Sequence, residues 1–188
     1  MKIERFIVGG VALLVGLLLG WMVRGVATYN VHAAQVATYD DWRVACPSAD
    51  MKDAACELSS DLVDKSQPNG SVLARATITS DKDGKQVMGF TLPYGVALEA
   101  GMGMRIGKDP VKVIQYRTCN NVGCIATTPF DDTLSNSLKN SDDAAILFAG
   151  LDGKPVSVPF SFHGYKTSLS AWKGAEAKRH SWFWRLWS

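Results

Sequence analysis

Four cysteines are the residues of this chain whose spacing most plainly predicts chemistry. Cys46 and Cys56 bracket nine residues, and Cys119 and Cys124 bracket four. Four cysteines allow three disulfide pairings, and two local bridges are the simplest of them. Zinc binding and thiol redox chemistry are the alternatives. Structural zinc sites favour cysteines two to four residues apart, and thioredoxin-type redox pairs have two intervening residues, so the spacing favours disulfides and predicts no metal site.

Disulfides predict an oxidising compartment, and the N-terminus independently predicts export. The segment from Phe6 to Val23 contains no charged residue and has basic residues on both sides. A helix of this length rises about 27 Å, close to the roughly 30 Å of a bilayer core. We therefore expect residues 1–24 to be a single transmembrane signal anchor, N-terminus inside, with the domain on the periplasmic side of the inner membrane. The alternative is a long signal peptide cleaved after Ala33, which would give a periplasmic or secreted protein.

No catalytic arrangement of side chains is recognisable. The three histidines, His32, His163 and His180, lie in separate parts of the chain. The sequence has no Gly-x-Ser-x-Gly nucleophile motif, no His-Glu-x-x-His zinc motif and no glycine-rich phosphate loop. The carboxylate pairs Asp131-Asp132 and Asp142-Asp143 are expected to be solvated surface groups. The sequence therefore predicts a protein that is not an enzyme, with no catalytic residues and no cofactor.

The C-terminal tail, residues 178–188, combines aromatic and basic side chains. Tryptophan favours the membrane–water interface, and lysine and arginine are attracted to anionic headgroups. Tryptophan and arginine are also frequent in protein interfaces. We therefore predict that the tail contacts the membrane or a protein partner; a segment folded back on the domain is the third possibility. The contact residues predicted in it are Trp182, Phe183, Trp184, Arg185 and Trp187.

A weaker candidate for partner contact is Pro93-Tyr94-Gly95, for which a buried turn is the favoured interpretation. Nucleic acid is not an expected partner. The chain has 20 Lys and Arg against 18 Asp and Glu, and the resulting net charge of +2 is too small to indicate it.

Between a tether (residues 25–39) and the tail, short alternating segments and frequent turns predict a mainly β domain over residues 40–177. Seven or eight short strands with such turns favour a sandwich. Helical spacing predicts two short amphipathic helices, one containing Phe130, Leu134 and Leu138 and one containing Tyr165, Leu169 and Trp172. The candidate strands are residues 42–46, 72–79, 86–92, 111–118, 144–149 and 156–162, with shorter candidates at 96–98, 102–106 and 125–128.

Five features follow one another in a recognisable order: Trp42 to Cys46, Cys56, Leu92 to Leu98, Gly123-Cys124, and the Gly164-Tyr165 helix start. This ordered set resembles the invasion-associated locus B family of bacterial envelope proteins. The resemblance implies an immunoglobulin-like β-sandwich, export to the periplasm or cell surface, and pairing of the cysteines within each close pair. It implies no catalytic residues. Some members of the family are associated with host-cell entry.

The expected protein is thus a non-enzymatic accessory protein of the envelope. Its disulfide-bonded β-sandwich, preceded by a transmembrane helix, would be presented to another envelope protein or membrane complex. The apparent anchor and the aromatic tail both depart from the pattern usual in the family. The alternative is a secreted or surface-exposed invasion or adhesion factor, released by signal cleavage.

Overall fold

The structure is a computed structural model that describes residues 2–27, 34–48, 51, 53–64 and 70–181. The chain divides into two compact units, Met1–Ala33 and Ala34–Ser188. The first unit contains helix α1 (Lys2–Ala27), whose side chains are described from Gly9 to Trp21. Among the described residues, no helix is both long and apolar enough to cross a membrane.

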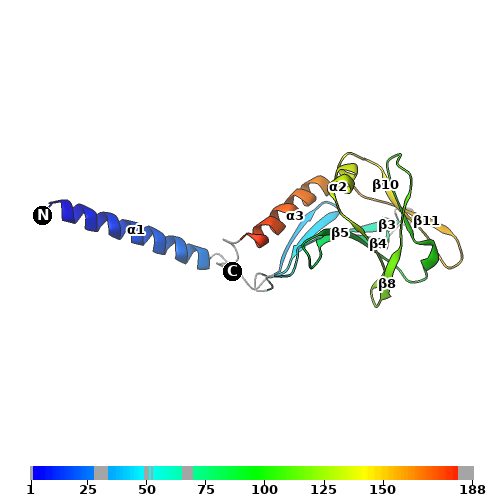
Figure 1. Cartoon of the computed structure of the whole chain (residues 1–188), viewed down its shortest axis with the longest axis horizontal. Helices are drawn as coiled ribbons and strands as arrows, with labels where there is room; N and C mark the ends of the chain where they lie inside the picture. Colours follow the sequence, from blue (N-terminus) through cyan, green and yellow to red (C-terminus); the bar gives the residue numbers. More distant parts are fainter. Residues whose placement is uncertain (1, 28–33, 49–50, 52, 65–69, 182–188) are drawn as a thin grey trace. The chain divides into compact units, whose positions relative to one another are not determined.

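The second unit is mainly β, with its described strands in two antiparallel sheets (Figure 1). The larger sheet has the order β1-β2-β3-β4-β5-β9-β8. Its strands are β1 (Gln35–Tyr39), β2 (Trp42–Cys46), β3 (Glu57–Asp64), β4 (Ser71–Ser80), β5 (Gln86–Leu92), β8 (Tyr116–Asn120) and β9 (Gly123–Pro129). The smaller sheet has the order β11-β10-β6-β7. Its strands are β6 (Met102–Ile106), β7 (Lys112–Ile114), β10 (Ala144–Ala149) and β11 (Pro155–Pro159).

Two α-helices and one 3₁₀ turn complete the described part of this unit. Helix α2 (Asp132–Lys139) begins where the Asp131 carboxylate accepts a hydrogen bond from the backbone N–H of Leu134 at 2.8 Å. This is the usual N-cap arrangement, in which a side chain satisfies a free amide of the first turn. Helix α3 is Tyr165–His180, and the 3₁₀ turn is η1 (Leu98–Ala100).

One hydrophobic core lies between the layers. Alternate residues of β5 are buried, as period-2 burial requires for a strand with one face on a core. The smaller sheet contributes a similar set from β6. Helix α3 packs on the β1–β3 part of the larger sheet, where the rings of Trp42 and Tyr165 have centroids 5.1 Å apart. The largest fully buried side chains in this core are Trp42, Trp172, Tyr165, Phe90, Leu58, Leu62, Ile78, Met88, Leu92, Met102, Leu138 and Ile146.

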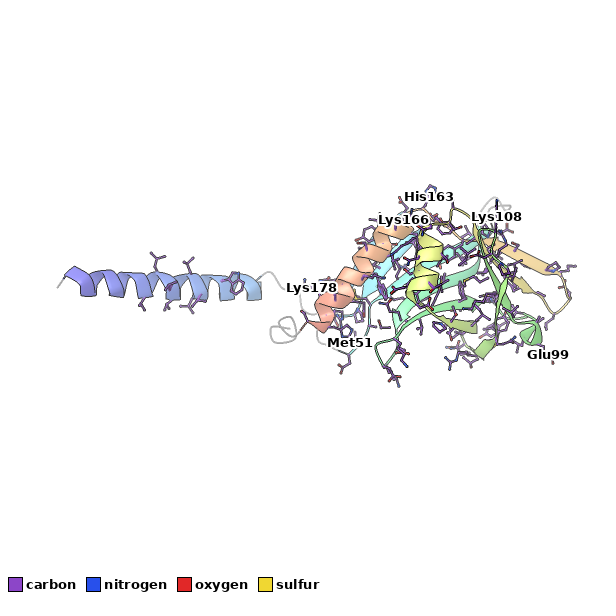
Figure 2. All side chains as sticks on the ribbon, turned by 45° about the horizontal axis from the view of Figure 1, so that its top comes forward. Met51, Glu99, Lys108, His163, Lys166 and Lys178 are labelled. Atoms are coloured by element: carbon purple, nitrogen blue, oxygen red, sulfur yellow. A yellow bond between two sulfur atoms is a disulfide. The ribbon has the colours of Figure 1, made fainter. Side chains whose placement is uncertain are left out.

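Strand register defines two opposite ends of the larger sheet. At the first, which we call the exit end, Gln35 pairs with Cys46 and Ser80 pairs with Gln86. At the second, which we call the loop end, Leu92 pairs with Cys124. In Figure 2, Met51 and Lys178 mark the exit end, and Glu99 lies at the opposite end of the domain. The β1–β2 and β8–β9 turns therefore lie at the loop end, and the β4–β5 turn lies at the exit end.

The structure differs from the sequence-based expectation in two strands. Gln35–Tyr39, assigned above to the tether, forms β1, whose residues are mostly exposed and therefore carry little hydrophobic pattern. Strand β3 (Glu57–Asp64) was not expected at all, because Ser59 and Ser60 are polar but buried. Both strands are held by pairing with neighbouring strands, which the hydrophobic pattern within each segment does not reveal.

Other boundaries also differ. Residues 96–98 are not a strand: Val96 makes an isolated bridge to Gly150 and η1 follows. The single strand expected over 111–118 is two strands, β7 and β8, that belong to different sheets. The final strand, β11, ends at Pro159, before the expected residue 162. Helix α3 extends to His180, into the segment assigned above to the tail.

The division into seven and four strands, with β1 to β5 paired consecutively, also differs from an immunoglobulin constant domain. That fold divides its strands into sheets of four and three with Greek-key connections. The expectation of a mainly β, two-sheet domain with few helices is confirmed at this coarser level.

Candidate functional site

The two disulfides lie at opposite ends of the larger sheet. Cys46 is bonded to Cys56, which joins the last residue of β2 to the residue before β3 at the exit end. Cys119 is bonded to Cys124, which spans the turn between β8 and β9 at the loop end. The structure thus has the two local pairings, and it has no free cysteine. Each disulfide closes a loop that other elements then contact.

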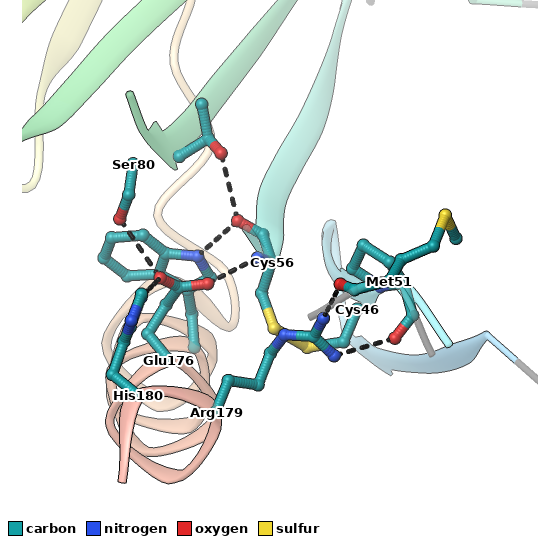
Figure 3. The surroundings of a disulfide bond; sticks show 10 residues. Cys46, Met51, Cys56, Ser80, Glu176, Arg179 and His180 are labelled. Atoms are coloured by element: carbon teal, nitrogen blue, oxygen red, sulfur yellow. Dashed lines mark hydrogen bonds and ion pairs between the residues drawn. A yellow bond between two sulfur atoms is a disulfide. The ribbon is translucent and has the colours of Figure 1, made fainter. Parts of the chain in front are cut away.

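At the exit end, a buried carboxylate of α3 contacts the first disulfide loop (Figure 3). Glu176 is 6% exposed and accepts hydrogen bonds from the backbone N–H of Cys56 and, at 3.1 Å, from the hydroxyl of Ser80. The Nε2 atom of His180, one helical turn later, lies 3.4 Å from the same carboxylate. Buried acids are rarely tolerated without such partners, so these contacts explain why Glu176 is buried.

The rest of this disulfide loop is also bonded to α3. The indole N–H of Trp172 donates to the carbonyl of Cys56 at 3.0 Å. Arg179 is 6% exposed and donates to the carbonyls of Pro47 at 2.9 Å and Met51 at 2.6 Å. Charge-assisted hydrogen bonds of this kind are stronger than neutral ones. Hydrogen bonds of Trp172, Glu176 and Arg179 therefore hold the last turns of α3 against the first disulfide loop.

The sequence carried a signal for this cluster that our prediction did not use. The helical stripe of Tyr165, Leu169 and Trp172 continues at the same spacing to Glu176 and Arg179. The sequence-based prediction named this stripe only as far as Trp172, and charged side chains normally mark a solvated face. The stripe is buried throughout because the carboxylate and guanidinium find backbone partners in the disulfide loop.

One consequence is that the two chain ends of the domain lie close together. Strand β1 begins at Gln35, which pairs with Cys46. Helix α3 finishes at His180, just after Arg179 has bonded to Pro47. The chain thus enters and leaves the described part of this domain beside the first disulfide loop.

At the loop end, three connections are bonded to one another around Gly95. The Tyr94 hydroxyl donates to the carbonyl of Asn120, in the loop closed by the second disulfide. The backbone N–H of Leu151, in the β10–β11 turn, donates to the carbonyl of Gly95 at 2.8 Å. Gly123 approaches β5 so closely that a β-carbon there would lie 2.2 Å from the carbonyl oxygen of Leu92. The second disulfide loop therefore packs directly on the Leu92–Gly95 segment.

These connections carry four exposed apolar side chains, which we call the loop-end surface. Tyr94 is 62% exposed, Leu98 50%, Val122 66% and Leu151 81%. Pro93-Tyr94-Gly95 is a turn, as expected, but the expectation that it would be buried is wrong. The ring of Tyr94 is held outward by the hydrogen bond from its hydroxyl to the carbonyl of Asn120. Exposed apolar groups that lie together on neighbouring loops are a common feature of protein-binding surfaces.

Two carboxylates among the remaining candidates for chemistry have structural partners. Asp131 caps α2, and Asp143 forms a two-pronged ion pair with Arg105, with one contact at 2.7 Å. The Arg105 guanidinium holds the pKa of the Asp143 carboxyl below its usual value. Burial raises the pKa of the Tyr165 phenol. Within the described residues, no group of three or more His, Cys, Asp or Glu side chains could hold a metal ion.

The strongest contact candidates of the sequence are not placed by the structure. Trp182, Phe183, Trp184, Arg185 and Trp187 lie outside the described residues. What the structure does give is the position from which this segment starts, at the C-terminal end of α3.

Comparison with known proteins gives a consistent result. The family model for invasion associated locus B (IalB) protein matches residues 42–173. Invasion protein B homologues of Brucella abortus strains 2308 and 9-941 are each 27% identical over 134 residues, covering 70% of this chain and 75% of theirs. The crystal structure of invasion associated protein B from Bartonella henselae aligns with a TM-score of 0.61 at 17% identity, over 76% of this chain and 99% of that one. At this identity the structural match shows a shared fold.

Proposed function

The chain belongs to the invasion associated locus B family, and on this basis we propose that it is a non-enzymatic envelope protein, anchored in the inner membrane, that presents its β-sandwich to a periplasmic protein partner. The disulfides support an oxidising compartment. The family is not a known enzyme family. The proposal therefore concerns where the domain is held and which surface it offers.

The observation that carries the proposal is the proximity of the two chain ends. Gln35 and the last turn of α3 both lie beside the first disulfide loop, at the exit end of the domain. A domain held through segments that leave from one end has its opposite end free. The exposed side chains of the loop-end surface are then available to a partner.

Two sequence features support a membrane on the exit side. Phe6 to Val23 is an uncharged stretch of the sequence with basic residues on both sides. Residues 182–188, which follow α3, contain three tryptophans and an arginine. Such residues favour the interface between lipid headgroups and water. Both segments can reach the same bilayer because their starting points on the domain are adjacent.

The first experiment is extraction of the full chain from membranes in mild detergent. The proposal expects a retained N-terminus and a protein that co-purifies in near-stoichiometric amount. The matched variants are Tyr94→Ser with Leu151→Ser, which change the loop-end surface, and Lys166→Ser with Lys173→Ser, which change α3. Loss of the partner in the first pair and retention in the second supports the proposal. Recovery without a partner, or equal partner loss in both, contradicts it.

The tail is tested separately with anionic vesicles. Truncation after Ser181 keeps all of α3 and its contacts to the disulfide loop. Residues 34–188, one compact unit of the fold, should sediment with phosphatidylglycerol vesicles, and residues 34–181 should bind at least about fivefold more weakly, given roughly 1 kcal/mol for each basic group near the surface and the added burial of aromatic rings. Equal binding of the two would exclude a membrane role for the tail.

A second candidate is a secreted or surface-exposed invasion or adhesion factor. The names of the Brucella and Bartonella relatives favour it, since they describe invasion-associated proteins. This candidate requires cleavage of the N-terminal segment, with Ala33-Ala34 the expected site. A mature protein that begins at Ala34 and is recovered outside the cell would replace the anchored protein as the better description.

A further inference from the structure

A cavity of about 380 Å³ lies at the loop end of the larger sheet, where β3 extends beyond the first residue of β2. Strand β2 pairs with β3 from Ala45↔Glu57 to Arg43↔Ser59. After Ser59, β3 continues to pair with β4 on one side, and no described pairing with β2 continues on the other side. The cavity occupies the place that a longer β2 would fill, and its volume is within the usual range for binding sites, roughly 300–1,000 Å³.

The lining shows that the cavity runs along the edge of β3. Its wall includes five consecutive residues, Ser59 to Val63. Successive side chains of a strand point to opposite faces, so a cavity on one face would be lined by alternate residues. Lining by consecutive residues places the backbone edge itself against the cavity. We call this cavity the β3 slot.

The β3 slot has two further walls that are held in place. The opposite wall is Pro159–Ser161, at the end of β11, and the closed end is the Asp40–Asp41 turn between β1 and β2. The Ser161 hydroxyl donates to the Asp41 carboxylate, and the indole N–H of Trp42 donates to the Ser161 carbonyl at 2.9 Å. These bonds connect the turn to the opposite wall, so the slot is preformed.

A buried polar group in the slot has no partner. Ser60 lines it and is 3% exposed, and its hydroxyl makes no hydrogen bond within the described part of the chain. Buried hydroxyls are usually paired, and each exception needs an explanation. A ligand with a hydrogen-bonding group beside Ser60 would supply the missing partner.

Unpaired charge on the slot is mainly negative. Asp40 and Asp41 are exposed at its closed end. Asp61 also lines the slot, but its carboxylate is bonded to Arg75 at 2.7 Å. Arg43 is the one basic residue among the lining residues. The closed end therefore favours a cationic group on whatever binds.

We propose that the β3 slot binds an extended segment of a partner protein, which adds antiparallel to β3 from Asp61 to Val63 and places a lysine or arginine at Asp40–Asp41. Strand addition is a common mode of peptide recognition, in which backbone hydrogen bonds give affinity and side-chain pockets give specificity. The opposite wall offers less pairing, because β11 begins and ends with prolines, which have no N–H. The proposal rests on the proposed function and adds a second contact site to it, since no residue of the loop-end surface lines the slot.

The site lies at the loop end, away from the chain ends at the exit end. A segment added in the direction of β2 has its C-terminal end next to the Asp40–Asp41 turn, because β2 and β3 are antiparallel. The basic residue is therefore expected after the strand-forming residues of the partner, and this order determines the design of the probe.

The test uses the full chain in detergent and a fluorescent peptide, acetyl-Val-Ser-Val-Ser-Lys-Lys-amide. We expect saturable binding with a Kd on the order of 100 µM, since a short peptide loses conformational freedom on binding. Two control peptides replace both lysines by glutamates or N-methylate both valines. The first loses the charge and the second loses backbone donors, so each should bind at least about fivefold more weakly.

Variants of the chain identify the site. The double variant Asp40→Asn with Asp41→Asn removes two charges, and asparagine tolerates the positive φ of Asp40 (50°). It should weaken binding at least about fivefold, whereas Asp109→Asn, in the β6–β7 turn, should not. Ser60→Ala removes the unpaired hydroxyl without added bulk and should weaken binding while the chain stays folded. Hydrogen exchange with bound peptide should slow for those amides of residues 61–63 that face the slot, since the alternate amides already face β4.

The proposal is wrong if binding does not saturate at about 1 mM peptide, which is tenfold above the expected Kd. It is also wrong if the N-methylated peptide binds as tightly as the parent peptide, or if exchange protection appears only outside β3. The outcome is independent of the membrane anchor, because the peptide is soluble and the protein is in detergent. If the chain proved not to be anchored in the membrane but still bound the peptide, the proposal for the β3 slot would stand. A co-purifying partner that binds without protecting residues 61–63 would uphold the proposed function and exclude the slot.

Discussion

The buried carboxylate of Glu176 accepts a hydrogen bond from the backbone N–H of Cys56, a residue 120 positions earlier in the chain. This contact joins the C-terminal helix to the loop closed by the first disulfide. It also fixes the relation between two segments that lead out of the domain, since β1 starts opposite Cys46 and α3 ends just after Glu176. The orientation proposed for the domain at a membrane depends on this relation.

Replacement of Glu176 tests how strongly α3 is held. Glu176→Ala leaves the N–H of Cys56 and the hydroxyl of Ser80 without their acceptor. We expect a loss of about 2–4 kcal/mol in the free energy of unfolding, because unpaired buried donors are costly. Glu176→Gln keeps one acceptor oxygen and should lose less. Urea unfolding of residues 34–188 measures both, and an unchanged midpoint for Glu176→Ala would show that the contact contributes nothing.

Alanine variants of Arg179 and of its neighbour Lys178 compare a buried basic residue with an exposed one. Arg179 is buried and bonded to the carbonyls of Pro47 and Met51, whereas Lys178 is exposed. Arg179→Ala should lower the free energy of unfolding by about 2–3 kcal/mol, and Lys178→Ala should stay within about 0.5 kcal/mol. Thermal melts followed by circular dichroism give the comparison. Similar effects of the two changes would mean that Arg179 does not hold the disulfide loop.

Replacement by alanine should have opposite effects on the stability of the domain at two glycines of the α3 region. Gly164 has a φ of 76°, and a β-carbon there would lie 2.0 Å from the Tyr39 carbonyl oxygen. Gly164→Ala should therefore destabilise the domain by about 3 kcal/mol or more, or prevent folding. Gly174 lies within α3 with nothing near its β-carbon position, so Gly174→Ala should stabilise by about 0.5–1 kcal/mol. Melting temperatures that fall in both variants would contradict this assignment.

The two disulfides should differ in their effect on stability. In the chain-entropy model, closing loops of these lengths stabilises by about 2–3 kcal/mol each. Cys46→Ser with Cys56→Ser should cost more than Cys119→Ser with Cys124→Ser, because the first loop also carries the contacts to Trp172, Glu176 and Arg179. Denaturant unfolding of the two double variants tests this order, and the reverse order would show that the α3 contacts form without the first disulfide.

The ion pair of Arg105 and Asp143 predicts a dependence on pH. The pKa of Asp143 is lower in the folded chain than its ordinary value of 3.8, because Arg105 donates to the carboxylate. The pair therefore contributes stability above the unfolded pKa, and this contribution is lost as the pH falls through the folded pKa. Asp143→Asn should be less stable than the parent at pH 7, by a small amount that salt reduces, and should equal it in strong acid.

Asp142→Asn provides the control for this experiment, since Asp142 is the exposed neighbour of Asp143. It should match the parent at both pH values. A difference between parent and Asp143→Asn that persists unchanged from pH 7 into strong acid would show that the effect comes from the amide rather than from the lost charge.

Much of the fold could be predicted from local pattern. Strand β2, the β4–β5 hairpin with its Asp81–Gly84 turn, and the helices α2 and α3 were all predicted near their observed positions. In each, the side chains that contact the core recur at the period of the element itself. The family, too, could be identified from a few residues in order, and the structure explains one pair of them, since Gly123 packs on the backbone of Leu92.

Strand β3 and the burial of Glu176 could not be predicted in this way. Ser59 and Ser60 are buried because β2, β4 and β11 lie beside them, and Glu176 is buried because Cys56 and Ser80 provide its donors. The contacts of Glu176 and the packing of β11 on β3 join segments about 100 residues or more apart in the chain. The sequence by itself determined the family and most elements, and it supplied the expectation of export, because periodicity and composition are local. Only the tertiary structure decided that the domain begins and ends beside the first disulfide loop, because that depends on contacts between α3 and residues more than 100 positions earlier. Only the tertiary structure also decided that β2 pairs with β3 no further than Ser59, because strand register is not set by local pattern.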